Sequence, residues 1–273
     1  MSNTANESEE VRDRYLGYTA ERNTGTRRYS GFRNELKYLR RVQPPGQPLR
    51  FLDVACGAGL FTEFMVEQFK VQQGVLGYGF DIDPALVKTA RERFGAARPN
   101  RGFAVGCGEQ IPYRNEVFDL CIANSILEHA QDWEVMLNEI ARVLKTSGVL
   151  VLYTTNRLHP FQQEVNHFPF YPWLPERIKR RVLAWIMRHR PDMVNYTEFP
   201  AIHWFTYEQL RGVLTGLKFQ VHTRLDLIEP GDLRGWKAFA RPILTLLRSV
   251  RWLRRLYYLY SRDVSIYAIK GPA

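Results

Sequence analysis

Short runs rich in β-branched and aromatic residues alternate with helical stretches from Leu49 to Tyr153. Such alternation is typical of βαβ units, in which each helix crosses over a parallel sheet. The pattern predicts a Rossmann-like, doubly wound α/β fold with a mostly parallel sheet of seven strands. Open sheets of this kind bind ligands outside the carboxyl ends of their strands. We therefore expect the functional residues in the loops that follow the strands.

The sequence predicts five strands in this block and two more near the C-terminus, with helices between them. The predicted strands are 50–55, 75–82, 102–105, 118–123, 148–154, 219–227 and 264–269. The predicted helices are 60–69, 84–94, 133–144, 176–189 and a stretch through 214 that Thr206 caps.

The chain divides into four segments. Residues 1–48 form a basic helical flank, and 49–156 form the ligand-binding core. Residues 157–205 contain six prolines and follow the fifth strand directly, so we expect this insertion to roof the ligand cleft. Residues 206–273 complete the sheet and include a basic amphipathic helix, 234–262, before the last strand.

The net charge of +10 is unevenly placed along the 273 residues. The core segment 51–156 is net acidic, whereas 234–262 holds eight Lys or Arg and no acid. In that segment arginines recur every seven residues opposite apolar positions. This pattern indicates a helix on an anionic membrane surface or a basic lid whose apolar face packs on the sheet. An ordinary amphipathic helix with solvated arginines is the alternative.

The three cysteines, Cys56, Cys107 and Cys121, are too few and too scattered for a disulfide framework or a zinc site. We expect no metal and a reducing, cytoplasmic setting, with peripheral membrane contact through the basic helix. The chain has no uncharged apolar run long enough to span a membrane, and its acidic N-terminus does not read as a secretory signal.

A Gly-rich turn follows the first predicted strand, in the sequence Asp-Val-Ala-Cys-Gly-Ala-Gly at 53–59. Such a turn lets the backbone approach a ligand closely. The dinucleotide pattern G-x-G-x-x-G would need a small residue at Thr62, which weakens a dehydrogenase interpretation. Asp81 ends the second strand, where its carboxylate can accept both hydroxyls of a ribose. Asp83 before Pro84 is typical of a helix cap.

Five motifs in this order resemble the class I S-adenosylmethionine-dependent methyltransferases of the small-molecule type, the group that includes quinone and sugar methyltransferases. The motifs are 53–59, 79–83, 108–113 with 118–120, 127–129 and 139–145. The resemblance implies S-adenosylmethionine as cofactor and methyl transfer as activity.

The resemblance also implies roles for single residues at the carboxyl ends of the strands. Asp53 and the backbone of Ala55, Cys56, Gly57 and Gly59 would hold the methionine end of the cofactor. Asp81 would bind the ribose, Ile82 would pack on the adenine face, and Gly108 and Glu109 would lie beside the adenine edge. Asn124 would face the amino-acid part of the cofactor or its methyl group. Two positions depart from the family pattern. Ala55 replaces its first glycine, and Cys107 replaces its usual acid after the third strand.

His129 is the predicted general base, because it follows the fourth strand and resembles a histidine that some sugar methyltransferases use. A structural histidine before the next helix is the alternative interpretation. Asn156, His167 and His203 lie in or beside the predicted roof and are candidate substrate-binding residues. Aromatic and basic side chains in the insertion favour a small or lipid-linked amphiphilic acceptor, methylated at oxygen.

Three other functions compete with this prediction. The basic charge suggests nucleic-acid methylation, but no Asn-Pro-Pro-Tyr-type sequence follows the fourth strand. A non-catalytic binding protein that keeps the cofactor fold is conceivable because of Ala55 and Cys107. A dehydrogenase is the remaining alternative. The sequence leaves the oligomeric state open.

Overall fold

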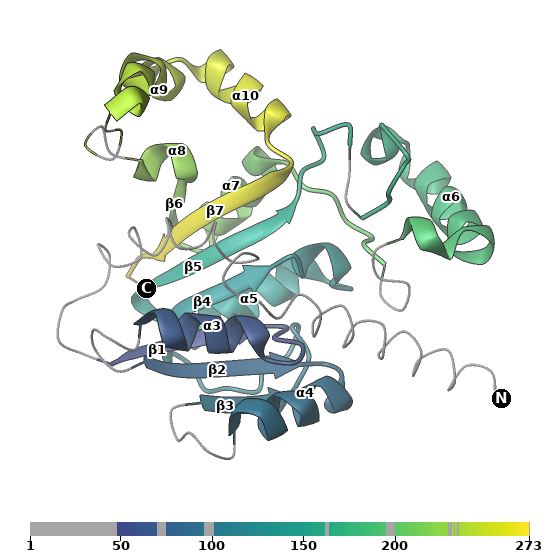
Figure 1. Cartoon of the computed structure of the whole chain (residues 1–273), viewed down its shortest axis with the longest axis vertical. Coiled ribbons are helices and arrows are strands. Elements are labelled where there is room, and N and C mark those ends of the chain that lie inside the picture. The colour runs from purple at the N-terminus through teal and green to yellow at the C-terminus, as the bar shows by residue number, and fades with distance from the viewer. Residues whose placement is uncertain are drawn as a thin grey trace.

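The protein folds around one seven-stranded sheet (Figure 1), here in a computed structural model that describes residues 48–69, 75–95, 101–161, 164–194, 200–228, 231, 233 and 235–272. The strand order is β3-β2-β1-β4-β5-β7-β6. The strands are β1 (Leu49–Val54), β2 (Val75–Asp81), β3 (Arg101–Val105), β4 (Phe118–Asn124), β5 (Leu144–Thr155), β6 (Phe219–Thr223) and β7 (Asp263–Lys270). This arrangement confirms the predicted doubly wound α/β fold.

The strands β1 to β5 pair in parallel, β6 points in the same direction, and β7 runs antiparallel to its two neighbours β5 and β6. The parallel strands bring their carboxyl ends to one edge of the sheet. There Ala123 pairs with Val54. On the next pair of strands, Thr155 at the end of β5 pairs with Asp263 at the start of β7. Loops far apart in sequence therefore meet along this edge.

Helices cover both faces of the sheet and bury two apolar clusters. On one face, α3 (Leu60–Phe69) packs Phe61 and Met65 against the sheet residues Phe51 and Ile122. On the other face, α5 (Trp133–Val143) and α7 (Tyr207–Gly216) cover a cluster that includes Leu137. Burial of these side chains stabilises the layers by roughly 1.5–3 kcal/mol for each large residue.

Side-chain caps begin three of the helices, and two of these caps, Asp83 and Thr206, lie where the sequence predicts them. Asp83 accepts a hydrogen bond of 2.7 Å from the backbone N–H of Ala85 at the start of α4 (Pro84–Ala90), which continues into a π turn over Arg91–Gly95. Asp132 caps α5 in the same way. Thr206 accepts from the N–H of Gln209 at the start of α7. These caps satisfy N–H groups that the helix itself leaves unpaired.

The inserted segment forms a small body with its own apolar cluster at the carboxyl end of β5. Its longest helix is α6 (Glu176–His189), beside short 3₁₀ turns at Tyr171–Trp173 and Pro191–Met193. Tyr171, Ile186 and Trp204 are among its buried residues. The Arg157 N–H donates to the carbonyl of Phe205 at 2.7 Å, so the insertion begins and ends at one place.

Two sequence predictions near the C-terminus are wrong. The strand predicted over 219–227 ends at Thr223, because Asp226 accepts from the Thr223 N–H and begins the short helix α8 (Arg224–Leu227). The single helix predicted over 234–262 is a 3₁₀ turn at Gly235–Ala240 followed by α9 (Arg241–Ser249) and α10 (Arg251–Tyr260). Val250 has extended backbone angles and separates the two helices. The predicted flank 1–48 lies outside the described residues, apart from Pro48.

Candidate functional site

The Gly-rich loop after β1 turns sharply at the carboxyl edge of the sheet. Its residues Ala55, Gly57 and Gly59 have φ angles of 57°, 53° and 77°. Two of the three are glycines, which adopt this left-handed region without steric cost. Ala55 adopts it although it has a Cβ, so the departure from the family pattern changes the residue and keeps the turn. The Cys56 N–H donates to the carbonyl of Phe80 at 2.9 Å and fastens the loop to β2.

Asp81 holds the loop from the end of β2. Its Oδ2 accepts from the Gly57 N–H at 2.8 Å, and its Oδ1 accepts from the Asp83 N–H at 3.0 Å. Burial raises the pKa of Asp81, and the two backbone donors oppose that shift. Each carboxylate oxygen has a second lone pair. Asp81 can therefore position the loop and still accept hydrogen bonds from a diol.

Asp53 lies almost fully buried at the end of β1. Its Oδ2 accepts from the hydroxyl of Thr62 on α3 at 2.7 Å, which joins the strand to the helix that follows the loop. Burial raises the pKa of Asp53 to about 7, and the hydrogen bond from Thr62 only partly compensates. A positive group that approached this carboxylate would favour its ionised form.

Two large apolar side chains stand exposed beside the loop. Ile82 is 55% exposed after β2, and Val105 is 46% exposed at the end of β3. Exposed apolar side chains at the carboxyl edge of a sheet can pack against the face of a flat apolar ring. Together with the diol-binding capacity of Asp81 and the open backbone of the loop, they fit the adenosine part of S-adenosylmethionine.

The loop after β3 is tied to the start of α5. The Glu109 Oε1 accepts from the N–H groups of Gln131 at 2.9 Å and Asp132 at 3.2 Å. The Cys107 thiol donates to Glu109 Oε2 at 2.7 Å. At Gly108, a Cβ would lie 2.5 Å from the terminal methyl of Met136, so the backbone approaches α5 closely. Glu109 thus places an acid near Cys107, and both oxygens of its carboxylate already accept hydrogen bonds from the protein.

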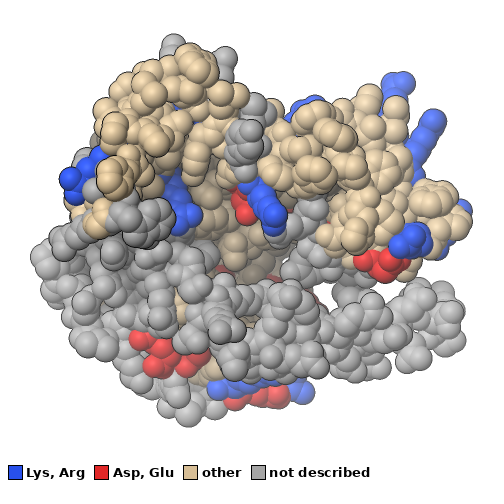
Figure 2. Space-filling view, turned by 45° about the horizontal axis from the view of Figure 1, so that its top comes forward, with Lys and Arg blue, Asp and Glu red and all other residues tan. Residues whose placement is uncertain are grey.

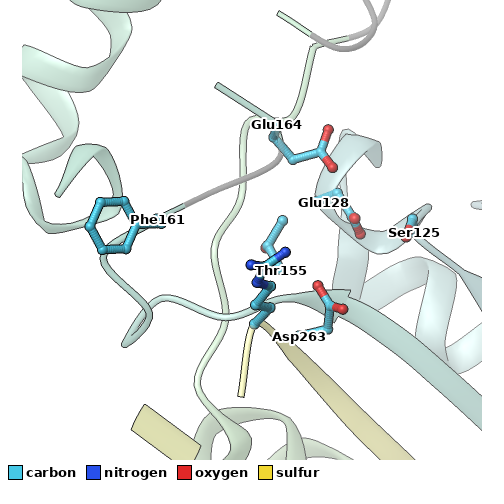
Figure 3. Close-up of a pocket in the computed structure, with 7 residues that line it drawn as sticks. Ser125, Glu128, Thr155, Phe161, Glu164 and Asp263 are labelled. Atoms are coloured by element: carbon cyan, nitrogen blue, oxygen red, sulfur yellow. The ribbon is translucent and has the colours of Figure 1, made fainter. Parts of the chain in front are cut away.

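A pocket opens beyond the carboxyl ends of β4 and β5, under the insertion (Figure 3). In the close-up the carboxyl groups of Glu128, Glu164 and Asp263 come from three separate elements toward one space. The pocket is lined by two hydroxyl residues, three acids, an arginine and an aromatic ring, namely Ser125, Thr155, Glu128, Glu164, Asp263, Arg262 and Phe161.

Glu128 is the most deeply buried acid of the pocket, with an exposed fraction of 1%. Its Oε2 accepts from the Thr154 hydroxyl at 2.7 Å. Burial raises the pKa of Glu128 to about 8, and the charges of Glu164 and Asp263 act in the same direction. The carboxyl group is therefore largely protonated at neutral pH.

His129 lies next to Glu128 in a 3₁₀ turn, Leu127–His129, after β4. Its Nε2 is 3.9 Å from Oε2 of Glu164, and the two side chains are 9% and 11% exposed. Asn124 ends β4 with an exposed side chain. The structure thus places His129 against an acid of the pocket wall, and Asn124 at the open edge between the loop and the pocket.

The three predicted substrate-binding residues are not brought together. Asn156 is buried, its amide N–H groups donate at 2.6 Å to the carbonyls of Tyr258 and Ser261, and its oxygen accepts from the Leu158 N–H, so it fastens β5 to α10. His167 is exposed on the insertion with a φ of 60°. The backbone of His203 bonds to Glu128 and Thr155, and its buried Nε2 has no hydrogen-bond partner among the residues that the structure describes.

Sequence reasoning missed Glu164, Arg262 and Asp263, and it gave no role to Glu128. Arg262 and Asp263 come directly before β7, whose antiparallel pairing with β5 sets them at the carboxyl edge. Recognition that the last strand runs antiparallel would have located them. Glu164 lies in the irregular part of the insertion and carries no local signal.

Known proteins share both the sequence of the core and the fold. A family model described as a methyltransferase domain matches residues 52–152. A ubiquinone biosynthesis O-methyltransferase of Parvibaculum lavamentivorans is 30% identical over 119 residues, which cover 43% of this chain and 44% of that protein. The chain spans about half the length of the curated relatives it matches.

Solved structures extend the likeness of the fold beyond the matched core. An S-adenosylmethionine-dependent methyltransferase from Mesorhizobium loti superposes with a TM-score of 0.54 and 16% identity, over 86% of this chain and 97% of that chain. A putative methyltransferase, solved in complex with the Haloferax volcanii Trm112 activator, gives a TM-score of 0.54 and 16% identity over 96% and 98%.

Proposed function

We propose, from the premise that residues 52–152 form a class I S-adenosylmethionine-dependent methyltransferase domain, that the chain transfers a methyl group from this cofactor to a small or lipid-linked amphiphilic acceptor. The proposed acceptor atom is an oxygen. The observation that carries the proposal is the pocket beyond β4 and β5. Strand β4 pairs with β1, and the Gly-rich loop follows β1, so the loop and the pocket lie at the ends of neighbouring strands. One edge of the sheet thus offers adjacent places for a cofactor and an acceptor.

The Gly-rich loop and the ends of β2 and β3 are the proposed cofactor site. The backbone of 55–59 would hold the methionine end, Asp81 the ribose hydroxyls, and Ile82 with Val105 the adenine. S-adenosylmethionine, when bound, supplies an electrophilic sulfonium methyl group. Asn124 would face that end of the site, since it is exposed between loop and pocket. The proposed setting is the cytoplasm, where the free cysteines stay reduced.

The pocket residues support an acceptor that bears hydroxyl groups. Ser125 offers a hydroxyl that donates or accepts. The Thr155 hydroxyl donates to the His203 carbonyl, so its oxygen can still accept, and Glu164 offers carboxylate acceptors. Phe161 is 64% exposed at the rim and suits an apolar part of the acceptor. Positioning alone contributes much of the rate in such reactions, because it replaces a bimolecular encounter by an oriented one.

His129 is the proposed general base. As the acceptor oxygen forms its bond to the methyl group, the bond from that methyl to the sulfonium sulfur would break and leave a neutral thioether. The hydroxyl proton of the acceptor would pass to the His129 imidazole. A positioned base of this kind typically contributes about 10²–10⁴-fold. Oxygen is favoured over nitrogen because the ubiquinone O-methyltransferase relative shares the core sequence at 30% identity.

The test combines cofactor binding with a search for the acceptor. Calorimetry should show binding of S-adenosylmethionine, and mass spectrometry of metabolite and lipid extracts should show a compound that gains one methyl group. His129→Ala should bind the cofactor normally and lose turnover. His222→Ala, on the far strand β6, is the matched control and should keep it. Absence of cofactor binding would leave the non-catalytic alternative, and tight salt-dependent RNA binding would favour a nucleic-acid substrate.

A further inference from the structure

The 3₁₀ turn Gly235–Ala240 and the helices α9 and α10 that follow it present large apolar side chains to solvent. Phe239 is 84% exposed, Ile243 59%, Leu246 52%, Trp252 62% and Leu256 42%. These five residues are called the apolar face below. Single exposed apolar residues are ordinary on protein surfaces, but five within eighteen positions form a cluster that usually marks an interaction site.

The apolar face points outward because arginines of the same helices bond inward. Arg248 donates to the backbone carbonyls of Leu225 at 2.7 Å and of Asp226 at 3.2 Å, at the end of α8. Arg254 pairs with the carboxylate of Asp226. Leu244, only 6% exposed, is the buried apolar residue of α9. Bonding of Arg248 and Arg254 to α8 fixes the rotation of both helices and leaves the apolar face uncovered.

The uncharged surface over these helices is extensive. Figure 2 shows a broad tan area over α9 and α10 with blue side chains at its margins. The inserted segment carries a second exposed set on another part of the molecule, including Trp173 at 53%, Ile178 at 45% and Trp185 at 57%. In Figure 1 α9 and α10 lie above the sheet, and α6 lies to its right, beyond the carboxyl end of β5.

The pocket lies between these two exposed sets. Arg262 and Asp263 of its lining follow α10 directly, and Phe161 and Glu164 belong to the inserted segment. A flat partner that touched both sets would therefore bridge the two segments that supply these lining residues. A small globular partner would have to match two separate convex bodies.

The basic charge of both segments favours an anionic partner over a second copy of the chain. Residues 234–262 hold eight Lys or Arg and no acid, and 157–191 hold seven against two acids. Arg248 and Arg254 of the first stretch bond inward, so its outward charge comes from other residues, among them the exposed Arg241 and Arg262. Helix α6 adds four exposed arginines, namely Arg177, Arg180, Arg181 and Arg188. Two copies of this chain that met through the apolar face would bring these like charges together, which opposes a symmetric dimer. Exposed Trp, Phe, Leu and Ile beside a basic surface are typical of helices that lie in the headgroup region of anionic bilayers.

We propose that the apolar face of α9 and α10 docks on an anionic phospholipid bilayer and that the insertion makes the second contact. The mouth of the pocket then faces the bilayer, so an acceptor is presented from the membrane. Docking itself depends only on this surface and is independent of the methyl-transfer reaction. None of the helices in the described ranges is long and apolar enough to cross a membrane.

The test is co-sedimentation of the full chain with vesicles. Vesicles of phosphatidylcholine and phosphatidylglycerol in about a 3:1 ratio should bind it at least tenfold more tightly than phosphatidylcholine alone, and added salt should weaken binding. The variant Ile243→Ser, Leu246→Ser, Trp252→Ser should lose at least tenfold in binding. Val135→Ser changes an exposed apolar residue on α5, 41% exposed, and should bind like the native chain.

Two results would overturn the proposal. The first is equal binding of the triple variant and the native chain, with both folded by circular dichroism and both binding S-adenosylmethionine. The second is concentration-dependent self-association of the native chain, lost in the triple variant, because the face would then be a contact between copies. Loss of cofactor binding in the native chain would instead count against the proposed function and leave the vesicle result standing.

Discussion

The His129 Nε2 lies 3.9 Å from the Glu164 Oε2, and this pair joins the loop after β4 to the inserted segment. A carboxylate at this distance can orient the imidazole, and a negative neighbour in general favours a protonated imidazole. Because Glu164 belongs to the inserted segment, the general base proposed at His129 would depend on the insertion.

Glu164→Gln should therefore lower turnover by about tenfold, less than the 10²–10⁴-fold expected for His129→Ala. It should also move the acidic limb of the pH profile to lower pH, since the imidazole loses its negative neighbour and gives up its proton more readily. The measurement is turnover against pH for the native chain and both variants. An unshifted limb in Glu164→Gln would show that Glu164 acts only in packing.

Glu128 makes stability depend on pH. Its folded pKa of about 8 lies above the ordinary value of 4.5 for a glutamate, so the folded state holds a proton that the unfolded chain releases between these values. The contribution of this carboxyl is complete below pH 4.5 and is lost as pH rises toward 8. Each proton held in this way changes the free energy of unfolding by up to about 1.4 kcal/mol per pH unit.

Glu128→Gln should remove this dependence, because the amide stays neutral and still accepts from Thr154. We expect its melting temperature to exceed that of the native chain at pH 8 and to approach it at pH 5. Thermal unfolding across this range is the measurement, and Glu134→Gln, on the exposed first turn of α5, is the control. Parallel melting curves for native chain and Glu128→Gln would contradict the raised pKa.

The sequence predicts what local chemistry determines. The bounds of α3 and α6 agree with their predictions, and the cap of Asp83 is where the Asp-Pro pair indicates it. It could not predict that Arg248 and Arg254 turn inward, because their partners on α8 are more than twenty residues away. A helical periodicity identifies two faces of a helix but not which one the rest of the protein covers.

The pocket shows the same limit. Glu128, Glu164 and Asp263 belong to three segments that only the assembled sheet and insertion bring together. By contrast, the Gly-rich loop and Asp81 follow neighbouring strands in one βα unit, so their spacing in the sequence already predicts that they meet. A site within one βα unit can therefore be predicted from the sequence, whereas an acceptor site between separate segments cannot.

Asp81 should control cofactor affinity through the loop that it holds. Asp81→Asn replaces one carboxylate oxygen by an N–H donor, so either the bond from the Gly57 N–H or that from the Asp83 N–H is lost. We expect the Kd for S-adenosylmethionine to rise at least tenfold, equivalent to about 1.4 kcal/mol. Asp83→Asn keeps an oxygen for the Ala85 N–H and should leave the Kd unchanged in calorimetry. Equal affinities of the two variants would count against Asp81 as a cofactor residue.

Ala55 carries backbone strain that glycine would relieve. Its φ of 57° is left-handed, a conformation that costs about 1–2 kcal/mol for a residue with a Cβ. Glycine also gives the unfolded chain more conformational entropy, which offsets part of the relief of strain. Ala55→Gly should therefore raise the free energy of unfolding by about 0.5–1 kcal/mol. Ala58, in the same loop, is not left-handed and is 2% exposed, so Ala58→Gly should lower it. Denaturant unfolding of both variants measures the contrast, and a loss of stability in Ala55→Gly would show that its methyl group contributes more by packing than it costs in strain.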